Sequence, residues 1–68
     1  MINSIRERRQ ELALTQQELA RLVGVSRQTI NAIETGKFDP SLSLAFKLSS
    51  VFKAPVEALF VPAQPDLS

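Results

Sequence analysis

The stretch that most constrains the fold is residues 16–35, which reads QQELARLVGVSRQTINAIET. Its apolar side chains recur at helical spacing in two short segments, one on each side of Gly24. Glycine readily adopts the left-handed conformation that ends a helix. Ser26, two residues later, is of a type that often caps the start of the next helix. The stretch therefore predicts two short helices joined by a tight turn.

Capping signals mark where the first helices begin. Thr15 followed by Glu18, and Ser4 followed by Glu7, both have the spacing of a capping box, in which the two side chains bond each other's backbone N–H groups. Gly36 follows the second of the two short helices and is expected to end it. The first three helices are therefore expected over residues 5–12, 16–23 and 27–35.

Two further helices are predicted in the second half of the chain. Asp39 before Pro40 suits a cap followed by proline at the first helical position. Pro55 is expected to start a short fifth helix. The fourth helix should bury a stripe formed by Leu42, Ala45, Leu48, Val51 and Phe52. The fold predicted is all-α, a compact five-helix domain over residues 1–61 with a flexible tail over residues 62–68. The ends of the domain, residues 1–3 and 60–61, could pair as a very short β-ribbon.

Composition excludes several classes of function. The 68 residues are enough for one domain, and 44% apolar residues are too many for a disordered segment. The chain has no Cys and no His, which removes disulfides, the usual zinc ligands and the commonest general base. We therefore expect no metal, no cofactor and no enzymatic activity. No apolar run is long enough for a membrane span, and charged residues come too early for a secretory signal, so a cytoplasmic protein is expected.

The helix predicted over residues 27–35 has one polar side. At about 100° per residue, Ile30 and Ile33 share an inward side. Arg27 lies on the flank, where its length still lets it reach outward. The residues on the outward side are Gln28, Asn31, Ala32 and Thr35. A surface helix also shows polar residues to water, but here the row follows a capped, glycine-containing turn, the arrangement of a helix-turn-helix.

These residue types suit the reading of base edges in double-stranded DNA. Arginine pairs with guanine, glutamine and asparagine pair with adenine, and the methyl group of Ala32 or Thr29 can touch a thymine methyl. The start of the second helix presents unpaired N–H groups that favour a phosphate. The predicted base-contacting residues are Arg27, Gln28, Asn31 and Ala32. The predicted phosphate-contacting residues are Thr15, Gln16, Gln17, Thr29 and Lys37, and the family resemblance given below implies the same role for Thr35.

Three segments carry a resemblance to a known family: LTQQELA (residues 14–20), VGVSRQTINAIETGK (residues 23–37) and DPSLSLAFKLSSVF (residues 39–52). Together they resemble the phage repressor and Cro type helix-turn-helix regulators, or XRE family, over residues 5–60. The resemblance implies a five-helix, lambda-repressor-like domain. It also implies a transcriptional regulator, a repressor, that binds a near-palindromic operator as a homodimer with its third helix in the major groove.

The resemblance also assigns roles by position. Gln16 would bind phosphate and brace Arg27, and Arg9 would form a structural ion pair with Glu34. Ala13 and Lys53 stand at helix ends where the family often has glycine, so a left-handed conformation there would be strained.

A second copy would dock on the fifth helix and the residues after it. The predicted dimer interface is Val56, Leu59, Phe60 and Val61, although Val56, Leu59 and Phe60 could instead belong to the chain's own core. Two other functions stay open at this stage. One is an antitoxin or protein-interaction module that neutralises a partner protein, with residues 61–68 as the docking segment, and autoregulates its operon. The other is a purely structural helical bundle, which the polar row argues against.

Overall fold

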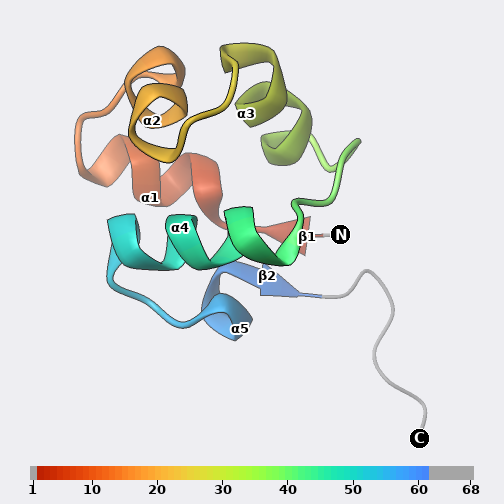
Figure 1. Cartoon of the computed structure of the whole chain (residues 1–68). Helices are drawn as coiled ribbons and strands as arrows, with labels where there is room; N and C mark the ends of the chain where they lie inside the picture. Colours follow the sequence, from red (N-terminus) through yellow and green to blue (C-terminus); the bar gives the residue numbers. More distant parts are fainter. Residues whose placement is uncertain (1, 62–68) are drawn as a thin grey trace, which may run out of the picture.

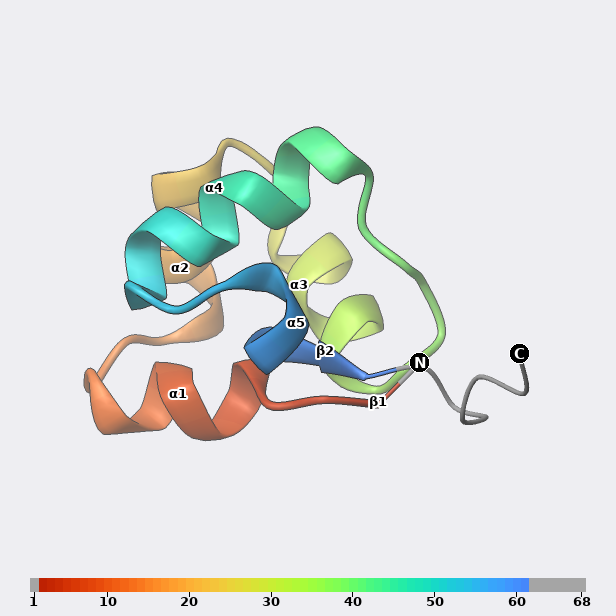
Figure 2. The ribbon, with the colours of Figure 1, turned by 90° about the horizontal axis from the view of Figure 1, so that it is seen from below.

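The computed structural model describes residues 2–61, in which five helices are framed by two short strands (Figure 1). The elements in order are β1 (Ile2–Asn3), α1 (Ile5–Glu11), α2 (Gln16–Val23), α3 (Arg27–Glu34), α4 (Leu42–Phe52), α5 (Val56–Leu59) and β2 (Phe60–Val61). The strands lie side by side (Figure 2) and pair antiparallel, with Ile2 opposite Val61 and Asn3 opposite Phe60. The five-helix fold and the terminal ribbon are confirmed, whereas the predicted tail over residues 62–68 lies outside the described residues.

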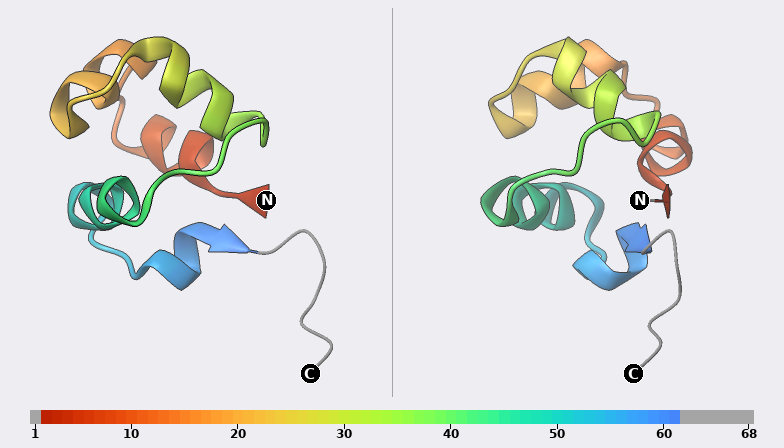
Figure 3. Two further views of the ribbon diagram at one scale, coloured as in Figure 1. Left: turned by 45° about the vertical axis from the view of Figure 1, so that its right-hand side comes forward. Right: turned by 90° about the vertical axis from the view of Figure 1, so that its right-hand side faces the viewer.

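The core forms where the apolar faces of the helices meet. α2 and α3 lie together on one side of the molecule, and α5 with β2 lies on the opposite side, with α4 between them (Figures 1 and 3). Among residues 2–61, the buried apolar residues that form the core are Ile5, Leu19, Ala20, Val23, Ile30, Ile33, Leu44, Ala45, Leu48, Leu59 and Phe60. The stripe predicted for α4 is wrong at its start. Leu42, the first residue of α4, is 67% exposed, and Leu44 is buried instead.

Of the predicted side-chain caps, the one at α2 is confirmed and the one at α1 is not. At α2 the capping box is confirmed: the Glu18 N–H donates to the Thr15 hydroxyl at 3.0 Å, and the Thr15 N–H donates to the Glu18 carboxylate at 2.8 Å. At α1 the predicted box is wrong, because the Ser4 hydroxyl accepts from Arg8 Nε instead. The Asn3 side chain takes over the capping role and accepts the N–H of Ile5 at 3.1 Å.

The cap predicted for α4 is also wrong. Ser41, not Asp39, is the N-cap, and its hydroxyl accepts the N–H of Leu44 at 3.1 Å. Pro40 therefore lies before the helix rather than in its first turn. The first α4 residues that must pack are Leu44 and Ala45, and a helix starting after Ser41 delivers them to the core. At α4 the position of the cap thus agrees with the packing of the helix, which the short motif of Asp39 and Pro40 does not report.

Within residues 2–61, two residues other than glycine adopt the left-handed conformation, Ala13 with φ of 57° and Lys53 with φ of 53°. Lys53 ends α4 there, and its N–H donates to the carbonyl of Ser49. Because a Cβ in this conformation approaches the following carbonyl, Lys53→Gly is expected to raise the free energy of unfolding by about 1 kcal/mol. Urea denaturation monitored by circular dichroism measures the change. Lys53→Ala, which keeps the Cβ, should show no such gain, and equal stability of the two variants would contradict the assignment.

Candidate nucleic-acid interface

The position of α3 is set by the turn that precedes it. Gly24 has φ of +75°, and no atom lies within 4 Å of where a Cβ would stand. Glycine is therefore favoured here by the backbone conformation and not by crowding. After the turn, the Ser26 hydroxyl caps α3 by accepting the N–H of Thr29 at 3.1 Å. Ile30 and Ile33 are buried beneath the helix. The result is a short helix held by one side, with the other side at the surface (Figure 3).

The predicted base-contacting residues come together on that surface. Arg27, Gln28 and Asn31 are exposed, and Ala32, at the edge of the row beside Gln28, is half-buried. α3 continues into a turn in which the N–H groups of Lys37 and Phe38 both donate to the carbonyl of Ala32, at 2.9 and 3.2 Å. The exposed side of α3 thus presents three polar side chains with one small residue beside them. Such a surface can approach a base edge closely.

Of the predicted phosphate-contacting residues, Thr15, Gln17 and Lys37 are exposed, and Thr15 and Gln17 lie at the start of α2. The hydroxyl of Thr35 donates within its own helix, to the carbonyls of Asn31 at 3.0 Å and Ala32 at 3.2 Å. It therefore has no proton to spare for a phosphate in this conformation. The backbone N–H groups at the start of α2, by contrast, point outward as the first N–H groups of any helix do.

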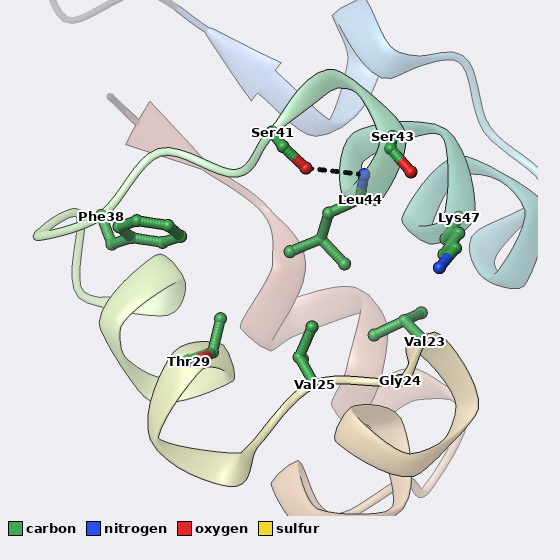
Figure 4. A pocket seen from close by; sticks show the side chains of 9 residues that line it. All are labelled: Val23, Gly24, Val25, Thr29, Phe38, Ser41, Ser43, Leu44 and Lys47. Atoms are coloured by element: carbon green, nitrogen blue, oxygen red, sulfur yellow. Dashed lines mark hydrogen bonds between the residues drawn. The ribbon is translucent and has the colours of Figure 1, made fainter.

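Thr29 lies apart from the row on α3. It faces a pocket of about 280 Å³ between the turn and α4 (Figure 4), and its hydroxyl is 3.0 Å from that of Ser26. The residues lining this pocket are Val23, Gly24, Val25, Thr29, Phe38, Ser41, Ser43, Leu44 and Lys47. Each residue turns a helix by about 100°, which is enough to carry Thr29 off the face shared by its neighbours Gln28 and Asn31. The structure does not bring Thr29 together with the other predicted DNA contacts.

A buried ion pair ties α1 to the end of α3. Arg9 Nε donates to Glu34 Oε2 at 2.7 Å, and Arg9 Nη2 donates to Oε1 at 3.3 Å. The Glu34 side chain is 0% exposed and that of Arg9 12%, so both charges are largely withdrawn from water. Arg9 Nη1 also donates to the carbonyl of Leu14 at 2.8 Å. The pair thus connects α1, the loop after it and the end of α3.

Two further side chains join this ion pair, and the sequence reasoning missed both contacts. Arg6 Nε lies 3.5 Å from Glu34 Oε1, with half of its side chain exposed. Arg6 and Arg9 are three residues apart and so share one face of the helix, and this spacing could have indicated that both reach Glu34. Gln16 was expected to brace Arg27. Its Nε2 instead donates to Glu34 Oε1 at 3.1 Å and to Asn31 Oδ1 at 3.3 Å, and the hydrogen bonds found among residues 2–61 include none from Gln16 to Arg27.

The environment of Glu34 favours its ionised form. Burial by itself raises the pKa of this carboxyl, but hydrogen bonds from Arg9 and Gln16 outweigh burial and leave the pKa below the ordinary value of 4.5. A carboxyl with a lowered pKa in the folded protein stabilises the fold above pH 4.5 and loses that effect as the pH falls through the folded pKa.

Comparing the unfolding free energies of the parent and Glu34→Gln at several pH values tests this titration. The parent is expected to be the more stable protein at pH 7, and the difference should shrink as the pH is lowered well below 4.5. Glu18 also has a lowered pKa, because it is hydrogen-bonded to Thr15, but both proteins contain it and its titration cancels in the difference. A difference that stays constant from pH 7 to pH 3 would contradict the role given to Glu34.

Two residues of the predicted dimer interface are buried in the chain's own core, the alternative that the sequence left open. Leu59 is 0% exposed and Phe60 is 8% exposed, because both pack into the chain's own core. Val61 remains 49% exposed, and Val56 is half-buried. An apolar pocket of about 290 Å³ opens on this side of the molecule, lined by Pro40, Leu42, Ala45, Val56 and Phe60. Leu42, which lines this pocket, is the most exposed of the large apolar residues among the described residues.

A sequence model of helix-turn-helix domains matches residues 5–59, which span α1 to α5. The chain belongs to this helix-turn-helix family. It is of the XRE type that the resemblance indicated. Within residues 2–61, no helix of this domain is long and apolar enough to cross a membrane.

Relatives of this helix-turn-helix chain occur in archaea and bacteria. An uncharacterized HTH-type transcriptional regulator of Archaeoglobus fulgidus is 51% identical over 61 residues, covering 90% of this chain and 87% of the relative. The HTH-type regulator YgzD of Bacillus subtilis is 42% identical over 60 residues, covering 88% and 91%. The crystal structure of the restriction-modification controller protein C.AhdI from Aeromonas hydrophila superposes with a TM-score of 0.74, at 32% identity, covering 82% of this chain and 85% of C.AhdI.

Proposed function

We propose that this protein is a sequence-specific regulator of transcription that binds double-stranded DNA with α3 in the major groove. The observation that carries the proposal is the row of Arg27, Gln28 and Asn31, exposed on a helix whose other side is buried through Ile30 and Ile33. Folding alone does not require these three residue types at the surface. The names of the relatives, HTH-type transcriptional regulators and a controller protein, support the same function.

Recognition would divide into base contacts and phosphate contacts. Arg27, Gln28 and Asn31 would pair with base edges, and Ala32 would contact a thymine methyl. The N–H groups at the start of α2, together with Lys37, would hold phosphates on either side of the groove and set the register of the protein on the duplex. The net charge of the chain is only +1, so affinity would depend on where its cations lie rather than on their excess.

Repression by a homodimer is the form of this function that we favour. One small module buries roughly 600–1,000 Å² against DNA, which is modest for specific binding at cellular salt. Two copies related by a two-fold axis would place their α3 helices about 34 Å apart and read a near-palindromic operator. A protein bound in this way near a promoter would exclude RNA polymerase by occupying its site.

The second copy is expected to dock on the apolar pocket lined by Leu42 and Val56. Phe60 also lines this pocket, and the exposed Val61 follows it in the chain. α5 and β2 lie on the side of the molecule away from α2 and α3, so docking there leaves the DNA-reading helix free (Figures 1 and 3). Leu42→Lys is expected to convert a dimer into a monomer in sedimentation equilibrium. Leu12→Lys, at a 51% exposed leucine after α1, is the matched control. A parent that sediments as a monomer at high concentration, with and without DNA, would reject the dimer.

Selection from random duplex DNA at a stated salt concentration tests the function itself. A two-fold symmetric motif with half-sites about ten base pairs apart is the expected result. Binding that is only non-specific and strongly weakened by salt would reject the proposal. The antitoxin or protein-interaction module would then return as the alternative. No feature of the described residues favours it at present.

A further inference from the structure

We propose that Gln16 is a positioning residue that turns the side-chain NH2 group of Asn31 toward the DNA, so that Asn31 selects guanine rather than adenine. The inference rests on the proposed function, because it concerns what Asn31 reads. It deepens that function by assigning a base preference to one position of the operator. It depends on three side chains in a row, Glu34, Gln16 and Asn31.

The first step is the Glu34 carboxylate, which is enclosed and held by Arg9 at 2.7 Å. An ionised carboxylate can only accept hydrogen bonds. Any side chain that contacts Glu34 must therefore direct a donor at it. The buried ion pair thus gives the network a fixed polarity at its inner end.

The second step is the orientation of the Gln16 amide. Its Nε2 lies 3.1 Å from Glu34 Oε1, and the opposite orientation would place the amide oxygen against the carboxylate. An amide on its own has two similar orientations, but this contact allows only one. The same NH2 group lies 3.3 Å from the side chain of Asn31. Since it is a donor, the atom of Asn31 that faces it is the oxygen Oδ1.

The third step is the other end of the Asn31 amide. With Oδ1 directed at Gln16, Nδ2 is on the opposite side of the amide group, and Asn31 is an exposed residue of α3. Guanine presents two acceptors, O6 and N7, in the major groove. Adenine presents one acceptor and one donor, so reading it with both ends of the amide requires Oδ1 to accept from the base as well. The contact with Gln16 competes with that arrangement and leaves donation to guanine favoured.

The orientation of the amides can be tested in the free protein. In 15N-labelled protein, the side-chain NH2 protons of Gln16 are expected to exchange with water more slowly than those of Gln17, which is exposed at the same end of α2. Glu34→Gln removes the fixed polarity and should abolish this difference. Equal exchange of Gln16 and Gln17 in the parent would overturn the proposed orientation whether or not the protein binds DNA.

Base preference is tested on operator duplexes that differ at one base pair. The pair read by Asn31 is the one at which Asn31→Ala loses discrimination. At that pair the parent is expected to bind guanine roughly tenfold more tightly than adenine, and Gln16→Met should lose most of this preference. Gln17→Met is the matched control. Loss of a phosphate contact should weaken binding to all four duplexes equally and leave the preference intact.

The outcomes separate the inference from the proposed function. If the parent selects no motif, the proposed function fails, and the exchange experiment still decides the orientation of Gln16. If the parent selects a motif but prefers adenine at the position read by Asn31, the inference is wrong and the proposed function stands. If Gln16→Met keeps the preference for guanine, the inference is also wrong and the proposed function stands, because Gln16 would then contact a phosphate and not Asn31 in the complex.

Discussion

Glu34→Ala is expected to lower the free energy of unfolding by about 3–5 kcal/mol, because it leaves the guanidinium of Arg9 buried without its partner. Arg9 is only 12% exposed and has bonds to both oxygens of the Glu34 carboxylate, so the lost contacts cannot be replaced by water without opening the structure. A chain of 68 residues has a total stability of roughly 3–10 kcal/mol. The variant should therefore be mostly unfolded, or should melt far below the parent, in a thermal scan monitored by circular dichroism.

Two controls separate the buried charge from general damage. Glu11→Ala removes an exposed carboxylate from α1 and should change stability by no more than about 0.5 kcal/mol. The double variant Arg9→Met/Glu34→Leu replaces both charges with apolar groups and should recover most of what Glu34→Ala loses, because no charge is left unpaired. Equal melting of Glu34→Ala and the parent would show that Arg9 finds adequate solvation elsewhere and would reject the importance given to the pair.

The elements that could be predicted from the sequence are those specified by local signals. Gly24 and the capping box of Thr15 and Glu18 act within a few residues, so the turn and the start of α2 were predicted correctly. The periodicity of Ile30 and Ile33 similarly identified the buried side of α3, and with it the exposed row. The left-handed positions of Ala13 and Lys53 were expected from the family resemblance, since relatives often have glycine at these helix ends.

The errors fall where distant parts of the chain compete. Ser4 had the motif of a capping box, but Asn3, which lies in the terminal ribbon, caps α1 instead. Gln16 could have faced Arg27, yet the buried carboxylate of Glu34 offers it a stronger acceptor. The sequence left Leu59 and Phe60 open between a dimer interface and the chain's own core, and only the packing of α5 against α4 shows that they complete the core. Asn3 is itself held by a remote partner, because its side-chain NH2 group donates to the carbonyl of Ile33 at 2.7 Å. A local pattern contains none of these remote contacts.

On a selected operator, Arg27→Ala/Gln28→Ala is expected to weaken binding by roughly 2–6 kcal/mol per half-site, because each bidentate contact to a base is worth about 1–3 kcal/mol. Both side chains are exposed in the first turn of α3 and make no structural contact that would unfold the domain when lost. The variant should therefore melt like the parent. Fluorescence anisotropy with operator and with scrambled duplex measures the change, and only the operator affinity should fall strongly.

The decisive comparison is with variants that remove the same chemistry elsewhere. Arg21→Ala/Gln10→Ala deletes one arginine and one glutamine from exposed positions of α2 and α1, so it matches the loss of charge without touching α3. Lys37→Ala should remove a phosphate contact, weakening operator and scrambled duplex alike and reducing the salt dependence by about one ion. If Arg27→Ala/Gln28→Ala behaved like Lys37→Ala, α3 would be holding the backbone and not reading bases, and the specificity assigned to its exposed row would be wrong.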